Sequence, residues 1–283
     1  MHVERHGQGE PLLLLHGLGG SARSWAPLLP LLAPHRSLVM PDLPGFGRTP
    51  LPDAPLNIAV LADAVEAFLD AEGLRGVAVC GHSMGGGVAL ELLRRGVTGP
   101  TVALAPAGFW AGWERGYMAG HIATGLANTR AIRPLLPMVA ALMPTRSLLF
   151  ALFSARPWAI PPELALDEAR CQAASPGSDP MVAQILVAPL QAGLAPGQAL
   201  PAPLAIGWGP LDRVTLVQQA ERALAAFPGA KLHWLGQGGH YVHWDEPELT
   251  ARLILDTCRT LRLAGPVAVA APMPAPAALP AVA

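Results

Sequence analysis

The stretch Val77–Gly87 reads VAVCGHSMGGG, and it decides the fold of this chain. Its apolar, β-branched start predicts a strand, and the residues from Met84 onward predict a helix. Ser83 therefore lies at the tip of a sharp turn, flanked by Gly81 and Gly85, because side chains at those two positions would collide across the turn. Such a turn exposes the hydroxyl and points the first amides of the helix at whatever the serine attacks. We interpret Ser83 as a nucleophile; the alternative is a glycine-rich turn without a catalytic role.

Strands and helices alternate on both sides of this stretch. Pro11–Leu15 is a continuous apolar run, which is typical of a strand buried on both faces of a sheet. Further strands are expected over residues 37–40, 101–105, 203–208 and 231–235, and helices over residues 25–32, 57–73, 216–226 and 246–263. This alternation predicts an α/β fold, with a mostly parallel central sheet and helices on both of its faces.

Residues 107–200 interrupt this alternation. They are rich in Ala, Leu, Met, Trp and Pro and contain no clear buried strand. We therefore expect a helical cap inserted into a sheet domain that comprises residues 1–106 and 201–263. Residues 264–283 carry no charge and contain five prolines, so we expect this tail to be disordered.

Composition limits the partners and the location of the protein. The chain has 283 residues and is 52% hydrophobic, so it can bury a large core. Its net charge is -1, so it lacks the excess of positive charge that would indicate binding to nucleic acid or an anionic membrane. Its three cysteines are far apart and predict neither a disulfide framework nor a zinc site. The polar N-terminus runs directly into a core strand, and arginines and prolines break the apolar region 131–153. We expect no signal peptide, no membrane span, no cofactor and a cytoplasmic location.

A serine nucleophile needs an imidazole that takes its proton and a carboxylate that fixes the imidazole tautomer. His240 follows two glycines after a strand, where a loop can bring its ring over the C-terminal edge of the sheet. His243 is its rival. Asp212 lies on a loop after the strand 203–208, at the same edge. Asp245 competes with it, although Asp245 opens the last helix, where the helix dipole already explains a carboxylate.

Four motifs resemble those of the α/β-hydrolase superfamily, and they follow one another in that superfamily's order. They are Leu14–Gly17, Asp42–Gly47, Gly81–Gly85, and Asp212 with Gly239–His240. We expect His16 and Asp42 in these motifs to be structural. The family usually begins with a two-strand hairpin before the Leu-rich strand. Here only about one strand's worth of residues precedes that strand, so we expect the sheet to lack its first edge strand.

The resemblance implies which residues carry the chemistry. The superfamily's order of serine, acid and histidine selects Ser83, Asp212 and His240 as the catalytic triad. It also implies an oxyanion hole made by the backbone amides of Leu18 and Met84.

The predicted cap decides the substrate. Trp110, Trp113 and Trp158 are candidates for lining an apolar acyl pocket, and the alternative is that they form the cap's own core. The arginines of the cap could likewise hold a substrate carboxylate or simply face water.

We therefore expect a serine hydrolase that acts on a carboxylic ester, or a related acyl compound, of a small apolar molecule through an acyl-enzyme. Trp244 resembles a position in carbon–carbon bond hydrolases of the same superfamily, which makes that activity an alternative. The loop His16–Gly19 does not resemble theirs closely. A non-catalytic receptor or carrier that retains the triad is a further alternative.

Overall fold

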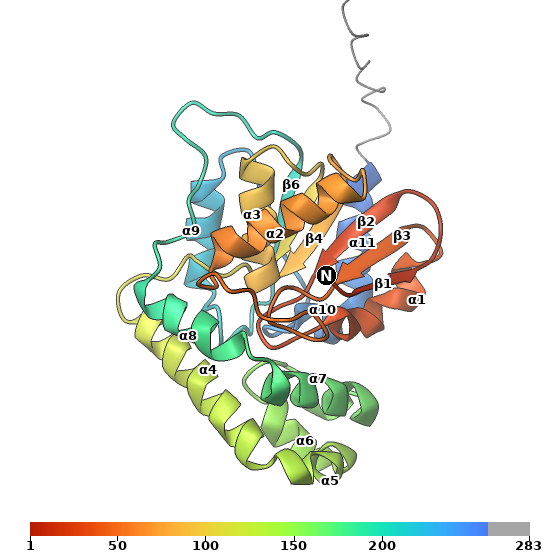
Figure 1. Cartoon of the computed structure of the whole chain (residues 1–283), viewed down its shortest axis with the longest axis vertical. Helices are drawn as coiled ribbons and strands as arrows, with labels where there is room; N and C mark the ends of the chain where they lie inside the picture. The colour runs from red at the N-terminus through yellow and green to blue at the C-terminus, as the bar shows by residue number, and fades with distance from the viewer. Residues whose placement is uncertain (260–283) are drawn as a thin grey trace, which may run out of the picture.

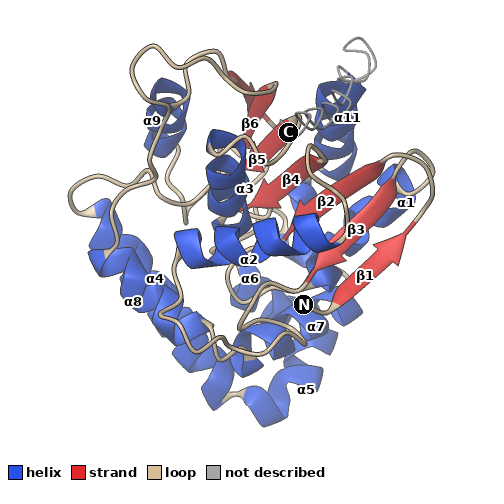
Figure 2. Cartoon of the chain, turned by 45° about the horizontal axis from the view of Figure 1, so that its top comes forward, coloured by secondary structure: helices blue, strands red, loops and turns tan. Residues whose placement is uncertain are grey.

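A computed structural model describes residues 1–259 of the chain. Seven strands form one sheet in the order β1-β3-β2-β4-β5-β6-β7 (Figure 2). They are β1 (Val3–His6), β2 (Pro11–Leu15), β3 (Ser37–Pro41), β4 (Ala78–His82), β5 (Thr101–Leu104), β6 (Leu204–Trp208) and β7 (Lys231–Trp234). β1 pairs antiparallel with β3, and the other neighbouring pairs are parallel. The predicted α/β fold is confirmed, and one strand, β1, precedes the Leu-rich strand β2.

The side chains of β2 alternate between hydrophobic cores on the two faces of the sheet. One face is covered by η1 (Ala22–Leu28), α1 (Leu29–Leu32) and α11 (Pro247–Arg259), and the other by α2 (Ile58–Ala71), α3 (Met84–Arg94) and α9 (Gln218–Ala226). Leu12 and Leu14 belong to the first core, and Leu13 and Leu15 to the second. All four are fully buried, which explains why this run is apolar at every position.

Between β5 and β6 the chain forms a group of helices, which we call the inserted helices. They are α4 (Glu114–Ala131), η2 (Arg133–Leu135), α5 (Leu136–Ala141), α6 (Met143–Phe150), η3 (Pro157–Ala159), α7 (Pro162–Ala174) and α8 (Ser178–Val187). The group lies below the sheet in Figure 1, in yellow to green. Because the chain enters it from the end of β5, and the parallel neighbours of β5 end at the same edge, the inserted helices cover the C-terminal edge of the sheet.

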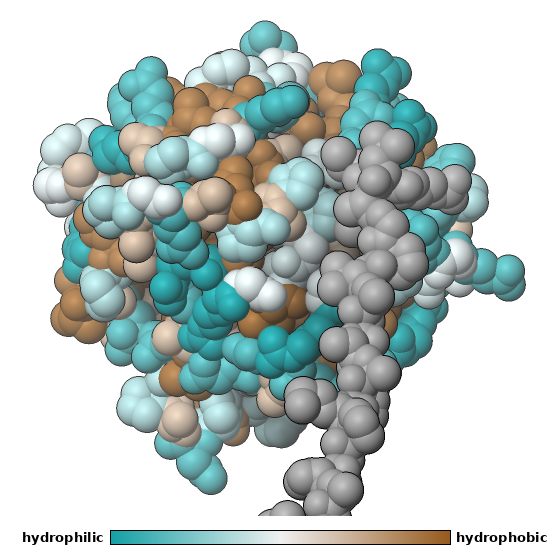
Figure 3. Space-filling model, turned by 90° about the horizontal axis from the view of Figure 1, so that it is seen from above, coloured by the Kyte–Doolittle hydropathy of each residue, from teal (hydrophilic) through white to brown (hydrophobic). Residues whose placement is uncertain are grey.

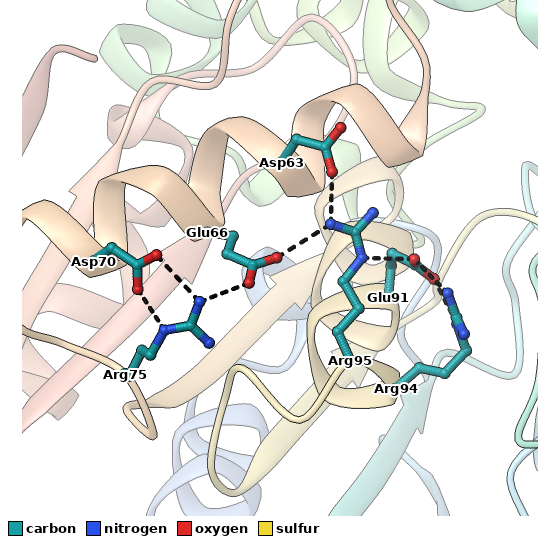
Figure 4. A network of polar contacts seen from close by, with 7 residues as sticks. All are labelled: Asp63, Glu66, Asp70, Arg75, Glu91, Arg94 and Arg95. Atoms are coloured by element: carbon teal, nitrogen blue, oxygen red, sulfur yellow. Dashed lines mark hydrogen bonds and ion pairs between the residues drawn. The ribbon is translucent and has the colours of Figure 1, made fainter.

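A network of ion pairs joins α2 to α3 (Figure 4). It comprises Asp63, Glu66 and Asp70 of α2, Glu91 and Arg94 of α3, Arg95 directly after α3, and Arg75. Arg95 contacts Asp63 at 2.6 Å and Glu66 at 3.2 Å, and its Nε lies 2.8 Å from Glu91. Ion pairs that are partly exposed add little stability one by one. Together they fix α2 against the helix that begins directly after Ser83.

The face opposite the inserted helices mixes hydrophobic and hydrophilic residues (Figure 3). Within residues 1–259, no helix combines the length and the apolar character needed to cross a membrane. The helix expected over residues 246–263 corresponds to α11, which is described up to Arg259, and the short α10 (Val242–Asp245) precedes it. The tail expected to be disordered, 264–283, lies outside the described residues.

Candidate active site

Ser83 joins β4 to α3 with a backbone φ of 52°. Residues with a side chain rarely adopt this conformation, which costs roughly 1–3 kcal/mol. Hydrogen bonds hold the turn in place. The Ser83 amide donates to the Leu104 carbonyl (2.9 Å), and the Ser83 carbonyl accepts from the amides of Gly87 and Ala107 (3.0 Å each). The strained conformation therefore keeps the serine at the N-terminus of α3.

Two glycines allow β2, β4 and α3 to approach each other at this turn. A Cβ on Gly81 would overlap the carbonyl oxygen of Gly85, and a Cβ on Gly85 would overlap that of Leu15. The amide of Met84 is the first of α3, and the helix itself offers no acceptor for it. The positive end of α3 therefore points toward the space that Ser83 faces.

His240 follows β7 and Asp212 follows β6, and the two side chains meet in the interior. His240 Nδ1 lies 3.0 Å from Asp212 Oδ2, and both residues are buried. Because the carboxylate accepts, Nδ1 carries the proton and Nε2 is left as the basic nitrogen. His240 also lines the same cavity as Ser83. The structure thus brings together the three residues that the sequence selects.

Three further hydrogen bonds hold the Asp212 carboxylate. Oδ1 accepts from the amides of Val214 (2.8 Å) and Thr215 (3.0 Å), and Oδ2 accepts from the Thr215 hydroxyl (2.7 Å). The same hydroxyl lies 3.2 Å from His240 Nδ1. Thr215 is not among the residues predicted from the sequence. An aspartate that accepts from amides two and three residues later forms an Asx-type turn, and this local pattern was the available signal.

Two other histidines pack around His240. His82 Nε2 donates to the His240 carbonyl (2.9 Å), and the His82 and His243 rings lie 4.5 Å apart. Burial lowers the pKa of His82 well below its usual value and lowers the pKa of His243 to about 3, so both rings are neutral at pH 7. His243 Nδ1 is buried without a hydrogen-bond partner. His240, not its rival His243, is the histidine that contacts Asp212.

His16 and Asp42 hold the neighbouring loops. His16 Nε2 accepts from an amide of the loop after β3 (2.9 Å), so its Nδ1 donates to the Gly17 carbonyl (2.8 Å). Asp42 accepts from the amides of Ala22 and Arg48, at 2.8 Å each. These contacts are structural, and they fix the turn that presents the amide expected in the oxyanion hole.

Asp245 has a different role from the one expected at a helix start. Its carboxylate accepts from the Ser154 hydroxyl (2.5 Å) and from the amides of Ala155 (2.8 Å) and Gly239 (2.7 Å). It therefore joins the inserted helices to the loop that carries His240. Proximity to a helix start in the sequence could not reveal partners that lie so far away along the chain.

Ser83 faces two cavities. The large cavity, of about 900 Å³, lies between the sheet edge and the helices α4–α7, and His240 lines it together with Ser83. The small cavity, of about 330 Å³, runs between α2, α3 and α8 and is lined by Ser83 and Met84 but not by His240. Leu18 lines both cavities. The backbone positions proposed for the oxyanion hole thus lie beside the serine.

The three tryptophans proposed to bind substrate have different surroundings. Trp110 is 6% exposed and lines the small cavity. Trp113 and Trp158 are 67% and 57% exposed and line neither cavity. Among the described residues, Arg94 is the one arginine or lysine that lines either cavity, and Glu91 binds its guanidinium. No arginine of the inserted helices lines a cavity with Ser83.

A buried carboxyl group lies in the wall of the large cavity. Glu168 of α7 accepts from the hydroxyls of Ser24 (2.6 Å) and Tyr241 (3.0 Å), and Gln172 donates to the Tyr241 hydroxyl (3.0 Å). Burial raises the pKa of Glu168 to about 7. This cluster was not predicted from the sequence. Glu168 and Gln172 follow Leu164 at intervals of four on the buried face of a helix, and polar residues on such a face require partners.

The cysteines are unpaired, with Cys80 and Cys258 buried. In residues 1–259, no three His, Cys, Asp or Glu side chains are grouped so that they could hold a metal ion.

The alpha/beta hydrolase family matches residues 12–253, and the chain belongs to this family. Solved structures agree on the fold. A thermophilic esterase from Thermogutta terrifontis has a TM-score of 0.71 and 19% identity, with 92% of this chain and 93% of that chain covered. A meta-cleavage product hydrolase from Pseudomonas fluorescens has a TM-score of 0.68 and 22% identity, with 92% and 94% covered. At these identities the likeness shows the fold alone.

Curated relatives match over shorter segments. A pimeloyl-[acyl-carrier protein] methyl ester esterase from Legionella pneumophila is 47% identical over 53 residues, which are 19% of this chain and 22% of that protein. The dihydrolipoyllysine-residue acetyltransferase component of the acetoin cleaving system from Cupriavidus necator is 34% identical over 145 residues, 50% of this chain and 37% of that protein. The chain thus matches well under half the length of either relative.

Proposed function

We propose that the protein is a serine hydrolase that cleaves a carboxylic ester through an acyl-enzyme. Ser83 is the nucleophile, His240 is the general base and then the general acid, and Asp212 orients His240. The observation that carries this proposal is the buried contact of 3.0 Å between His240 Nδ1 and Asp212 Oδ2, beside the cavity that Ser83 faces. It leaves His240 Nε2 basic, as the removal of the serine proton requires.

Each step of the proposed reaction has a residue that transfers the proton or stabilises the negative charge. Ser83 Oγ attacks the ester carbon while its proton passes to His240 Nε2, and the carbonyl oxygen becomes negative. The amides of Leu18 and Met84 are the proposed donors to this oxygen. The leaving alcohol then takes the proton from His240 as the acyl-enzyme forms. Water repeats the same steps on the acyl-enzyme and releases the acid.

The charges around Ser83 favour an ester without negative charge. The large cavity is lined by the acid Glu168 and, among the described residues, by no arginine or lysine. In the small cavity, Glu91 binds Arg94 through two hydrogen bonds of 2.7 and 2.8 Å. A substrate carboxylate that enters either cavity would lose its hydration without gaining an arginine or lysine that is free to pair with it, and this loss is unfavourable.

Carbon–carbon bond hydrolysis is the second candidate. Trp244, which resembles a position in such hydrolases, lines the large cavity, and its Nε1 donates to the Ser24 carbonyl (2.7 Å). The fold is also similar to that of a meta-cleavage product hydrolase. A substrate panel separates the two activities, because p-nitrophenyl esters test the first and vinylogous diketones test the second.

A fluorophosphonate probe tests the nucleophile directly. We expect one adduct, located on Ser83 by mass spectrometry, and a loss of ester turnover of roughly a thousandfold or more in Ser83→Ala. Ser147→Ala, on α6, is the matched control and should keep wild-type turnover. An adduct on another serine, or none, contradicts the proposal. Tight binding of a ligand without turnover of any ester or diketone would instead support a receptor or carrier.

A further inference from the structure

Ser83 lies where two cavities of unequal size meet, and His240 lines only the large one. We propose that the small cavity binds the acyl chain and the large cavity binds the leaving alcohol. The substrate class is then an ester of a linear apolar acid with a bulky alcohol that has both apolar and polar parts and carries no negative charge. This assignment rests on the proposed serine-hydrolase mechanism and deepens it.

The position of the general acid assigns the leaving group. When the tetrahedral intermediate collapses, the bond from the carbonyl carbon to the alcohol oxygen breaks, and that oxygen takes the proton from His240 Nε2. The alcohol must therefore lie on the side of His240, in the large cavity. The acyl chain extends from the same carbon in another direction. The small cavity begins at Ser83, between Leu18 and Met84, and supplies that direction.

The walls of the small cavity suit an alkyl chain. Its lining contains several large apolar side chains from α2, α3, α4 and α8: Ile58, Met84, Met118, Met181 and Ile185. Met84, Glu91 and Arg94 line it from one face of α3, so the cavity follows that helix away from Ser83. Eleven residues at 1.5 Å each separate Ser83 from Arg94, a path of about 16 Å.

The outer end of the small cavity is polar. Arg94 and Glu91 lie there and belong to the ion-pair network between α2 and α3 (Figure 4). The Arg94 side chain is 35% exposed, so this end reaches the surface. An alkyl chain is therefore buried up to this point, and methylenes beyond it would lie against charged groups and water and gain nothing further.

The walls of the large cavity mix polar and apolar side chains. Apolar ones such as Leu126, Leu149 and Phe153 make up a large part of the lining. Hydroxyl and amide side chains from the inserted helices line it, namely Tyr117, Thr124, Asn128, Thr129, Thr145 and Gln172. Its volume of about 900 Å³ exceeds the 330 Å³ of the small cavity. Departure of the alcohol also empties the space beside His240 that the hydrolytic water must then occupy. One cavity thus serves both the leaving group and the water, while the acyl chain stays in the other.

A covalent adduct tests the assignment on the wild-type protein. A p-nitrophenyl alkylphosphonate with a linear octyl chain forms a bond from Ser83 Oγ to phosphorus as nitrophenolate leaves, so only the mimic of the acyl part remains. We expect the crystal structure of this adduct to show the octyl chain along α3 in the small cavity. A chain in the large cavity overturns the assignment. Failure of Ser83 to react overturns the proposed function itself, which is a distinguishable result.

Two matched substitutions test the same assignment in kinetics. Ile58→Trp narrows only the small cavity, and Leu152→Trp narrows only the large one; both residues are half-buried. We expect Ile58→Trp to lower kcat/KM for p-nitrophenyl octanoate by about tenfold or more while p-nitrophenyl acetate changes by less than about twofold. Leu152→Trp should instead lower kcat/KM for naphthyl acetate. If Leu152→Trp suppresses the octanoate selectively and Ile58→Trp does not, the cavities are assigned the wrong way round.

Discussion

Replacing Glu168 with glutamine removes the one acid that, among the described residues, lines the large cavity, and it barely changes the shape of the side chain. Folding takes Glu168 from water to a site where it is 5% exposed. Its pKa rises from 4.5 to about 7 because burial penalises the charged form more than hydrogen bonds from Ser24, Tyr241 and Gln172 favour it. The nearby carboxylate of Asp167 raises the pKa further.

The sign and the size of the effect on stability follow from this pKa. Between pH 4.5 and pH 7 the folded protein keeps a proton on Glu168 that the unfolded chain loses, so the free energy of unfolding falls as the pH rises. One pKa unit corresponds to about 1.4 kcal/mol, so the rise from 4.5 to about 7 costs about 3 kcal/mol once Glu168 is ionised. The Glu168→Gln variant has no such cost.

Urea unfolding at pH 5, 6, 7 and 8 measures this cost. We expect the free energy of unfolding of the wild type, minus that of Glu168→Gln, to fall by about 2–3 kcal/mol from pH 5 to pH 8. Other titrating groups cancel in the subtraction. Glu163→Gln is the control, because Glu163 is an exposed acid in the first turn of the same helix. The free energy of unfolding of the wild type, minus that of Glu163→Gln, should vary little with pH. If the free energy of unfolding of the wild type, minus that of Glu168→Gln, is constant or grows toward high pH, the reasoning is refuted.

Three further predictions concern the site and its support. Asp212→Asn should lower kcat by about four orders of magnitude while the protein still folds, because the amide favours the wrong imidazole tautomer. Asp245→Asn should instead keep kcat and lower the free energy of unfolding by about 1.5–3 kcal/mol, because it weakens charged hydrogen bonds. Ester kinetics and urea unfolding of both variants check this pair, and an inactive Asp245→Asn beside an active Asp212→Asn would move the acid. Thr215→Val should lower kcat about tenfold through loss of one hydrogen bond to the Asp212 carboxylate, and unchanged kcat would show that this bond does not orient the triad. Gly85→Ala should abolish folding, because the added Cβ would overlap the β2 backbone. Gly116→Ala has open space around its Cβ in α4 and should raise the free energy of unfolding by up to about 1 kcal/mol. Circular dichroism and thermal melting of both variants test this contrast.

The parts of the molecule that follow from local constraints could be predicted from the sequence. Four consecutive leucines in β2 indicate a strand between two cores, because both faces of that strand must be apolar. Gly81 and Gly85 indicate the turn, because only glycine fits where the strand and the helix meet. His240 and Asp212 were predictable as candidates because parallel strands deliver their following loops to the same edge of the sheet.

The parts that depend on contacts between distant segments could not be predicted. Glu168 lies far along the chain from Ser24 and Tyr241, and only the packing of α7 against the sheet edge brings the three together. Trp113 and Trp158 show the same limit. A tryptophan in an inserted segment can line a pocket or face solvent, and neither its type nor its spacing decides between the two. The division of the space around Ser83 into two cavities likewise depends on how the inserted helices sit on the sheet.

The architecture separates the chemistry from the choice of substrate, and this separation has a physical cause. Ser83, Asp212 and His240 follow β4, β6 and β7, whose backbones are fixed by the ladder hydrogen bonds of the sheet. The strain at Ser83 persists because its amide donates to Leu104 of β5 and its carbonyl accepts from the amides of Gly87 in α3 and Ala107 after β5. Most of the cavity walls come from the segment between β5 and β6, which contributes no strand and shares no ladder with the sheet. Under the proposed function, substitutions in those walls should therefore change which ester is cleaved, while the geometry of Ser83, Asp212 and His240, and with it the pH dependence of the chemical step, stays the same.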